Sequence, residues 1–241
     1  MVTDWGGVRA LVIAPHADDE VIGCGGLISR IKRAGGQVHV LYLSVDGLTE
    51  YSAAGGSSTR QRLSEIQQVA RFLSLDSWHV ARIGEEATLR LDTSPRAELV
   101  SLLEGRPPHP VALPVLRPDV VLIPEVTSYN QDHHAVARAA LTALRPGPET
   151  FRHQPALVLA YEEVADFWSG ATVPAAARSI FVELSAGDLD RKIAGLSLYA
   201  SQWRDHPHTR SEPALRGLAA VRGAHSGFAY AEAFQCLRWR G

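Results

Sequence analysis

Short apolar runs, each followed by a segment with helical periodicity, place the strongest constraint on the fold of this chain. The runs are rich in Val, Ile and Leu and are apolar on both faces, which is typical of a parallel sheet covered on both sides. They lie at residues 8–15, 37–45, 78–83, 118–125, 156–163 and 179–184. Strands that alternate with helices predict βαβ units. The sequence therefore predicts a Rossmann-like three-layer α/β/α fold with a mostly parallel sheet.

Helix-period segments fill the intervals between these runs. They lie at residues 19–33, 58–75, 94–105, 132–144 and 188–204, and a last one runs from residue 213 to the C-terminus. The proline-rich residues 105–118 are interpreted as a connector, and the polar residues 50–59 as a loop near a site. A chain of 241 residues, 46% of them hydrophobic, suffices for one sizeable core or at most two small ones. We expect a single domain over residues 1–241, with a small C-terminal addition from about residue 165.

Composition argues against several classes of protein. The net charge is −2, which gives no basic footprint for a nucleic-acid partner. The two cysteines, Cys24 and Cys236, form neither a disulfide framework nor a zinc-finger spacing. The N-terminal residues show no signal-peptide pattern, and no apolar run approaches the roughly 18 residues of a membrane span. We therefore expect a cytoplasmic protein.

A histidine and three carboxylates follow the first apolar run, in HADDE at residues 16–20. In doubly wound sheets, ligands bind at the carboxyl ends of the strands where the strand order reverses. A dinucleotide site would place glycines there, but Gly23, Gly25 and Gly26 come later and with the wrong spacing. A helix N-cap explains an Asp pair alone. The added imidazole of His16 favours zinc or a similar divalent ion.

A second polar cluster, NQDHH at residues 130–134, follows the fourth apolar run. In a strand order of 3-2-1-4-5 the first and fourth strands are neighbours at the switch point. We therefore expect His16, Asp19 and His133 to converge there as metal ligands. The neighbouring carboxylate of the Asp pair is then available as a base.

At these residues the sequence resembles the LmbE-like family, also called the PIG-L deacetylases. These are zinc-dependent enzymes that remove acyl groups, usually acetyl, from amino sugars and related amines. The family motif H-P-D-D-E reads HADDE here, and H-x-D-H reads NQDH. Residues 62–75 and 227–234 are similar to two further family features, so the resemblance extends from about residue 8 to 238. It implies an LmbE-like fold, one Zn²⁺ per chain or another divalent metal, and a small-molecule N-acylated substrate.

The resemblance implies roles for individual residues. It assigns His16, Asp19 and His133 as metal ligands and Asp18 as the general base. Asp132 is expected to orient one of the ligands from behind.

One departure from the family pattern bears on the reaction. Asn130 stands where many members have a histidine assigned to acid or oxyanion duty. Asparagine donates a hydrogen bond but cannot deliver a proton. The proton donor is therefore open between Asp18 and another histidine. Ala17 in place of the family's proline is a smaller change.

Other residues keep two interpretations. Glu20 caps its helix or orients His16, and Arg62 contacts a sugar or forms a surface salt bridge. His208 and His225 are candidates for substrate binding, each weighed against a solvated-loop or turn position. Trp168 and Trp203 are predicted to be core residues rather than pocket walls that stack on a sugar.

The resemblance implies a zinc-dependent hydrolase that removes an N-acetyl group from an amino sugar or glycoconjugate by metal-activated water. Two alternatives stay open. One is an amidase acting on a non-sugar N-acylated metabolite or thiol conjugate, and the other is a non-catalytic Rossmann-like metal-binding protein. A homo-oligomer also stays open, because some relatives form hexamers or other oligomers.

Overall fold

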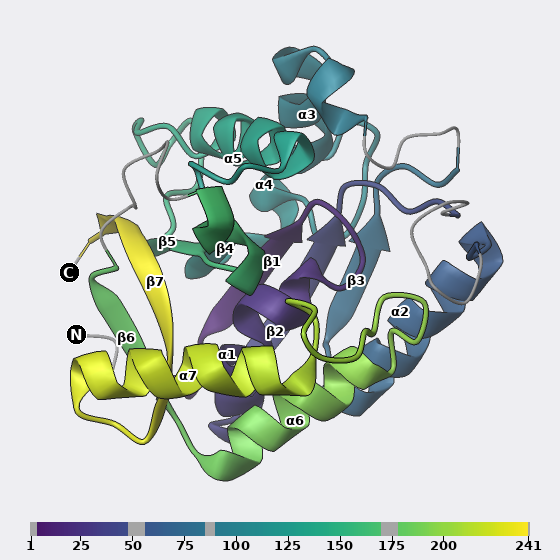
Figure 1. The fold of residues 1–241 in the computed structure, drawn as a ribbon. Coiled ribbons are helices and arrows are strands. Elements are labelled where there is room, and N and C mark those ends of the chain that lie inside the picture. The colour runs from purple at the N-terminus through teal and green to yellow at the C-terminus, as the bar shows by residue number, and fades with distance from the viewer. Residues whose placement is uncertain (1–3, 48–55, 85–89, 170–177, 241) are drawn as a thin grey trace.

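The structure is a computed structural model that describes residues 4–47, 56–84, 90–169 and 178–240. Its centre is a seven-stranded sheet with the order β3-β2-β1-β4-β5-β7-β6 (Figure 1). The strands are β1 (Arg9–Ala14), β2 (Gln37–Tyr42), β3 (Ser77–Val80), β4 (Val120–Pro124), β5 (Leu157–Tyr161), β6 (Ile180–Leu184) and β7 (Tyr230–Trp239). The helices are α1 (Asp19–Arg33), α2 (Thr59–Leu73), α3 (Arg96–Leu103), α4 (Leu113–Leu116), α5 (Gln131–Ala143), α6 (Ala186–Ser197) and α7 (Glu212–Ser226), with 3₁₀ turns η1 (Leu91–Thr93) and η2 (Val164–Ser169).

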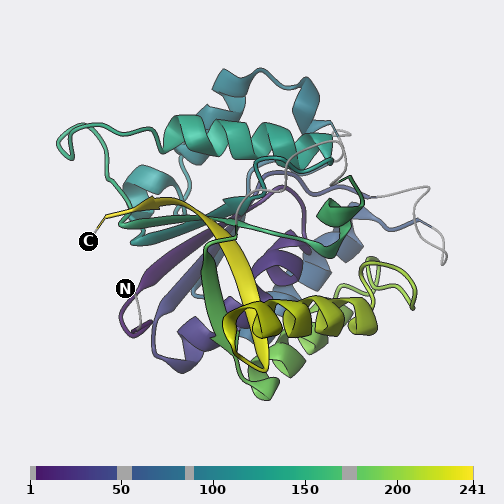
Figure 2. The ribbon, with the colours of Figure 1, turned by 60° about the vertical axis from the view of Figure 1, so that its left-hand side comes forward.

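Helices cover both faces of the sheet, so the predicted three-layer α/β/α fold is confirmed. Figure 2 shows α3 and α5 on one side and α1, α6 and α7 on the other. Alternate residues of the parallel strands enter two separate cores: Val12 faces α1, whereas Leu11 faces the side of α3 and α5. Both residues are fully buried. Burial on both faces explains why the strands read as continuous apolar runs.

The parallel part of the sheet has the expected order 3-2-1-4-5, because β1 pairs with both β2 and β4. The carboxyl ends of β1, β4 and β5 therefore open on the same edge, where strand order reverses. The chain after residue 165 adds β6 and β7 to this sheet, with β7 antiparallel to β5 and to β6. The division into one domain with a small C-terminal addition stays a prediction.

Two local expectations were wrong. The last helix does not continue to the C-terminus: it ends at Ser226, is followed by Gly227 with a φ of +79°, and β7 comes next. The interpretation of residues 105–118 as a connector is not contradicted, and this connector contains the short helix α4. Trp168 is not a core residue, since 75% of it is exposed, whereas Trp203 packs against the core as expected. The predicted loop at residues 50–59 lies for the most part outside the described residues.

A buried carboxylate on β7 fixes α1 to the sheet. Glu232 accepts hydrogen bonds from the backbone amides of Gly26 at 2.9 Å and Leu27 at 2.7 Å. It also pairs with Lys192 of α6 at 2.7 Å. A buried carboxylate is tolerable only with such partners. The last strand of the chain therefore helps to hold the helix that begins at the site.

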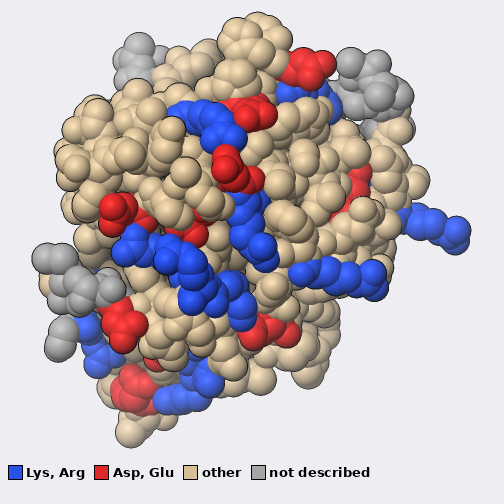
Figure 3. All heavy atoms as spheres, turned by 90° about the horizontal axis from the view of Figure 1, so that it is seen from below, with Lys and Arg blue, Asp and Glu red and all other residues tan. Residues whose placement is uncertain are grey.

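Charged side chains of both signs are interspersed over the face that lies below in Figure 1 (Figure 3). On α7, for example, Arg216 pairs with Glu212 at 2.8 Å and with Asp190 of α6 at 2.7 Å. Exposed pairs of this kind contribute little to stability. Within the described ranges, no helix is long and apolar enough to cross a membrane.

The glycines of α1 permit close packing rather than phosphate binding. A Cβ atom at Gly23 would lie 2.2 Å from Cδ2 of Tyr161 on β5. Tyr161 is fully buried, and its hydroxyl donates to the carbonyl oxygen of Ile13 at 3.1 Å. The ring therefore has little freedom to move away from α1.

We expect Gly23→Ala to lower the free energy of unfolding by about 1–3 kcal/mol, because the added methyl group overpacks this contact. Gly217→Ala on α7 is the matched control, since nothing lies within 4 Å of its Cβ position. That control should stabilise the helix by up to about 1 kcal/mol. Urea unfolding of the two variants measures both effects. A Gly23→Ala protein as stable as the wild type would contradict the packing argument.

Candidate metal centre

The loop that links β1 to α1 carries the HADDE motif, and it is buried. His16, Asp18, Asp19 and Glu20 are each less than 9% exposed. Asp18 has a φ of +121°, which is unusual for a residue with a side chain. Strained backbone of this kind is found most often at functional sites. Asp19 and Glu20 lie in the first turn of α1, where the helix dipole favours negative charge.

Two carboxylates bracket the imidazole of His16. Its Nε2 lies 2.9 Å from Oδ2 of Asp132, and its Nδ1 lies 3.4 Å from Oδ2 of Asp19. When His16 is neutral, the Asp132 contact favours the tautomer with the proton on Nε2, which leaves the Nδ1 lone pair available to a cation on the side of Asp19. Asp132 in turn accepts from the backbone amide of Asp92 at 3.2 Å. A metal-binding histidine usually donates the hydrogen bond of its other ring nitrogen to a carboxylate in this way, which fixes the orientation of the ring.

His133, in the first turn of α5, completes the cluster. Its Nε2 lies 3.3 Å from Oδ2 of Asp19, and one ligand atom from each of His16, Asp19 and His133 lies within 4.8 Å of the others. Ligands about 2.1 Å from a tetrahedral zinc ion are about 3.4 Å apart. The two contacts of Asp19, at 3.3 and 3.4 Å, match that spacing. Two imidazoles and a carboxylate also suit zinc chemically.

The carboxylates buried around this cluster carry negative charge that a bound cation would stabilise. Burial lowers the pKa of His16, but hydrogen bonds with Asp132 and Asp19 and the charges of these two groups outweigh it and raise the pKa to about 9. A proton on His16 then neutralises part of the negative charge. Burial, followed by the charge of Asp19, also raises the pKa of Glu163 well above its usual range. Buried carboxylates in excess are stabilised by a bound cation.

Asp18 is not one of the three clustered residues, and its carboxylate faces a cation of the protein. Its Oδ2 is buried and accepts no hydrogen bond, but Nε of Arg210 lies 3.3 Å away. Burial raises the pKa of the Asp18 carboxyl, and the charge of Arg210 opposes that rise. Nη1 of Arg210 donates a hydrogen bond to Oε1 of Gln202 at 3.0 Å, which helps to hold the guanidinium in place. Asp18 is therefore a buried carboxylate whose Oδ2 is held by an ion pair with Arg210 and accepts no hydrogen bond.

Glu20 points to the opposite side of the loop, where two tyrosines meet it. Tyr199 donates to its Oε1 at 2.6 Å, and the backbone amide of Asp18 donates to its Oε2 at 3.1 Å. The hydroxyl of Tyr42 lies 3.3 Å from that of Tyr199. Burial raises the pKa of Glu20 to about 7, and the hydrogen bond from Tyr199 opposes the rise. Glu20 thus holds the backbone at Asp18 rather than His16.

Arg62 on α2 likewise contacts the backbone of the HADDE loop. Only 3% of this residue is exposed, and its Nη2 donates to the carbonyl oxygen of Ala17 at 2.5 Å. Its Nη1 donates to Ser201 at 3.0 Å. Arg62 therefore supports the HADDE loop through its backbone, and it does not line the adjoining cavity.

A cavity of about 180 Å³ opens beside the cluster. His133 and Asn130 line it from α5, and His208 and Arg210 line it from the loop before α7. Asn130 caps α5 by accepting from the amide of Asp132 at 3.0 Å, which leaves its amide nitrogen available to a ligand. His225 does not line this cavity: it is exposed on α7, next to Arg222.

Among the cavity-lining residues that sequence reasoning did not single out, three bear on the chemistry of the site. Glu163 follows β5, and its Oε1 lies 3.9 Å from Nδ1 of His133. Arg210 comes from the polar loop before α7, and Tyr129 precedes the Asn130 cap. The one sequence signal for Glu163 was its position at the end of a buried strand next to the switch point. Arg210 belongs to the same polar loop as the candidate His208, but nothing local marks the arginine itself.

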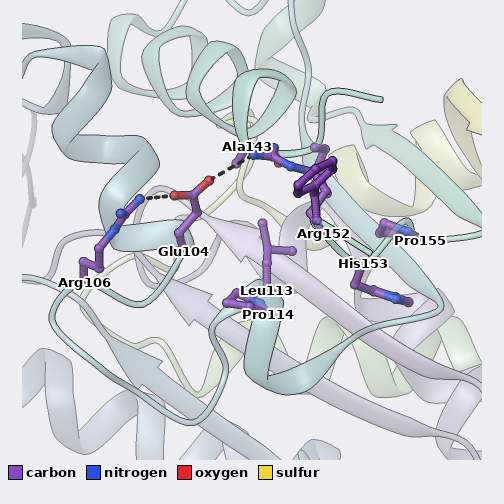
Figure 4. A pocket seen from close by; sticks show the side chains of 10 residues that line it. Glu104, Arg106, Leu113, Pro114, Ala143, Arg152, His153 and Pro155 are labelled. Carbon is purple, nitrogen blue, oxygen red and sulfur yellow. Dashed lines mark hydrogen bonds and ion pairs between the residues drawn. The ribbon is translucent and has the colours of Figure 1, made fainter. Parts of the chain in front are cut away.

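A larger cavity, of about 350 Å³, lies near the amino ends of β4 and β5 (Figure 4). Its charged groups satisfy one another, because Glu104 pairs with both Arg106 and Arg152. His153 bonds to the carbonyl oxygen of Pro118 at 2.7 Å. The smaller cavity is therefore the better candidate site, since it adjoins the buried cluster at the switch point.

Fold and site together define a Rossmann-like α/β protein with a candidate mononuclear metal centre at the carboxyl edge of its sheet. The family described as PIG-L: GlcNAc-PI de-N-acetylase matches residues 11–144, which include both polar motifs. The chain belongs to this family, and the resemblance inferred from HADDE and NQDH is confirmed.

Comparison with individual proteins shows how broadly this fold is used. The diacetylchitobiose deacetylase of Thermococcus kodakarensis is 24% identical over 236 residues, covering 93% of this chain and 81% of that protein. The conserved protein TT1542 from Thermus thermophilus is 26% identical, with a TM-score of 0.70 over 95% of this chain and 94% of that one. GalB, the 4-carboxy-2-hydroxymuconate hydratase of Pseudomonas putida KT2440, is 21% identical, with a TM-score of 0.69 over 97% and 98% of the two chains. Since GalB is a hydratase, the fold alone does not specify a reaction.

We expect His133→Ala to abolish retention of zinc, because the cluster loses one of its three ligand atoms. Asp132→Asn should weaken zinc binding by about 10- to 100-fold, as is typical for a partner that orients a ligand. His134→Ala is the matched control, since that side chain accepts a hydrogen bond from Arg138 outside the cluster. Metal content after dialysis, measured by mass spectrometry on variants shown to be folded by circular dichroism, checks this. Full zinc retention by His133→Ala would refute the ligand assignment.

Proposed function

We propose that this protein is a zinc-dependent N-deacetylase that hydrolyses the N-acetyl group of an amino sugar or glycoconjugate. The observation that carries the proposal is the convergence of His16, Asp19 and His133. His133 also lines a cavity, and Asp18 pairs with Arg210 of the same cavity lining. Membership of a de-N-acetylase family supports the amide as the bond that is cleaved. The diacetylchitobiose deacetylase relative supports an N-acetylated sugar as the substrate class.

His16, Asp19 and His133 are the residues that would hold the ion, which leaves a coordination position free for the reaction. A bound zinc ion supplies a Lewis acid that polarises the amide carbonyl and lowers the pKa of water. Asp132 keeps the Nδ1 lone pair of His16 available by accepting a hydrogen bond from Nε2. Asp19 presents Oδ2 to both histidines.

Asp18 is proposed as the general base. Its carboxylate takes the proton of the attacking water, which makes the oxygen nucleophilic toward the amide carbon. Arg210 holds this carboxylate in place and favours its charged form. The amide nitrogen of Asn130 donates a hydrogen bond to the oxyanion that develops on the former carbonyl oxygen.

The amine must receive a proton to leave. Asn130 cannot supply one, so Asp18 returns to the amine nitrogen the proton that it took from water. The C–N bond then breaks, and the products are a free amine and acetate. One carboxylate thus serves first as base and then as acid, which conserves protons over the cycle.

The alternatives predict different results in a panel assay. Amine release is measured from N-acetylated amino sugars, including glycoside- and nucleotide-linked ones, with zinc, after chelation, and after zinc is restored. The proposal expects release from at least one sugar, lost on chelation and regained with zinc. Release only from non-sugar amides would favour the general amidase. No release from either group by zinc-loaded protein would favour a non-catalytic metal-binding protein. The cytoplasmic location stays a prediction, and a homo-oligomer stays open.

We expect Asp18→Asn to lower kcat by about 10²- to 10⁴-fold, the usual contribution of a general base. The variant should retain zinc, since the three proposed ligands are intact. Steady-state kinetics combined with zinc analysis of the same preparation separates the two effects. Near-wild-type turnover by zinc-loaded Asp18→Asn would exclude Asp18 as the base.

A second variant tests the contact between Arg210 and Asp18. Arg210→Gln removes a positive charge that lowers the pKa of Asp18, so that pKa should rise. Because the base must be ionised, the acidic limb of the profile of kcat/KM against pH should move to higher pH. Arg216→Gln is the control, because Arg216 pairs with Glu212 and Asp190 instead. An unmoved acidic limb in Arg210→Gln would show that this pair does not govern the base.

A further inference from the structure

Two aromatic side chains are exposed close to the candidate site. Trp168 is 75% exposed and Tyr129 is 48% exposed, although both are large rings that proteins tend to bury. Their rings meet edge to face, with centroids 5.5 Å apart and planes inclined by 76°. Tyr129 also lines the 180 Å³ cavity that His133 lines. The pair therefore stands at the margin of the cavity.

The segments that carry the two rings are fixed to each other. Tyr129 lies between β4 and α5, and Trp168 lies on η2 after β5. Ser128 donates a hydrogen bond to Oδ1 of Asp166 at 2.7 Å, which joins these segments next to the rings. Oδ2 of Asp166 accepts from the amide of Glu163 at 3.0 Å. A ligand that binds the pair meets a preformed surface, which reduces the entropic cost of binding.

The neighbouring aromatic side chain is already engaged. Phe167 lies under the guanidinium of Arg222 of α7, at 5.1 Å from the ring centroid. Successive residues of η2 thus face different neighbours: Phe167 contacts α7, and Trp168 contacts Tyr129. Phe167 is itself 42% exposed, so both aromatic residues of η2 are exposed, but it is Trp168 that contacts the ring lining the cavity.

The cavity beside the pair is mostly polar. Its lining includes Ser128, Asn130, Asp166, Thr209 and Arg210, all of which bear groups that can hydrogen-bond. A long hydrocarbon chain would find little apolar surface there. A pyranose ring has both properties that this place requires, since its hydroxyl groups suit the polar lining and its C–H face suits an aromatic ring.

We propose that Tyr129 and Trp168 form a binding subsite for a second pyranose ring, joined by a glycosidic bond to the N-acetylated sugar in the cavity. This inference rests on the proposed function and deepens it, because it makes a disaccharide or longer glycoside a better substrate than the free monosaccharide. Trp168 then determines specificity without taking part in bond cleavage. Its contact is with the ring that does not react.

The test compares N,N′-diacetylchitobiose with N-acetylglucosamine as substrates of the zinc-loaded protein. The wild type should show the higher kcat/KM for the disaccharide. Trp168→Ala should lower that value by about tenfold, mainly through KM, and leave the value for the monosaccharide unchanged. Trp168→Phe keeps an aromatic face and should restore most of the loss. Phe151→Ala is the matched control, because Phe151 is 84% exposed and lines the cavity at the amino ends of β4 and β5.

Equal effects of Trp168→Ala on both substrates, or no effect on either, would overturn the subsite. Calorimetric binding of N,N′-diacetylchitobiose to Asp18→Asn, with and without Trp168→Ala, separates this failure from failure of the proposed function. Binding that depends on Trp168 in a protein that releases no amine from any sugar would keep the subsite and refute the deacetylase. Absence of binding would refute the subsite as well.

Discussion

Negative charge buried at the carboxyl end of β1 is the constraint on which the rest of this site depends. Asp18, Asp19 and Glu20 are consecutive and almost inaccessible to solvent. Each is stabilised by a different neighbour: Arg210 faces Asp18, the two histidines face Asp19, and Tyr199 donates to Glu20. Carboxylates without such partners would lose their charge or unfold the loop. The elements around β1 are arranged to supply these partners.

This arrangement explains why residues far apart in sequence are tied to one loop. Arg62 binds the carbonyl oxygen of Ala17, and Asp132 bonds to His16. Glu232 binds the amides of α1 one to two turns further on. The parallel pairing of β1 with β4 brings the two polar motifs to the same edge. The sheet thereby sets where the residues of the two motifs lie, and the buried polar contacts set how their side chains are oriented.

The sequence was sufficient to predict the parallel sheet, its order and the meeting of HADDE with NQDH. These follow from apolar runs buried on both faces and from the rule that sites lie where strand order reverses. The contact of Arg210 with Asp18 was not predictable, because a polar loop gives no local sign of where it folds. β7 was missed for a similar reason: its partners, such as Leu157 opposite Trp239, are distant in sequence. The exposure of Trp168 likewise depends on tertiary packing alone.

X-ray absorption spectroscopy at the zinc edge of the zinc-loaded protein tests the central claim most directly. The account predicts about two imidazole nitrogens and two oxygens at about 2.0–2.2 Å, and no sulfur. One oxygen would come from Asp19 and the other from water or substrate. A spectrum dominated by sulfur scattering, or one without imidazole, would contradict the assignment of His16, Asp19 and His133 as the metal centre.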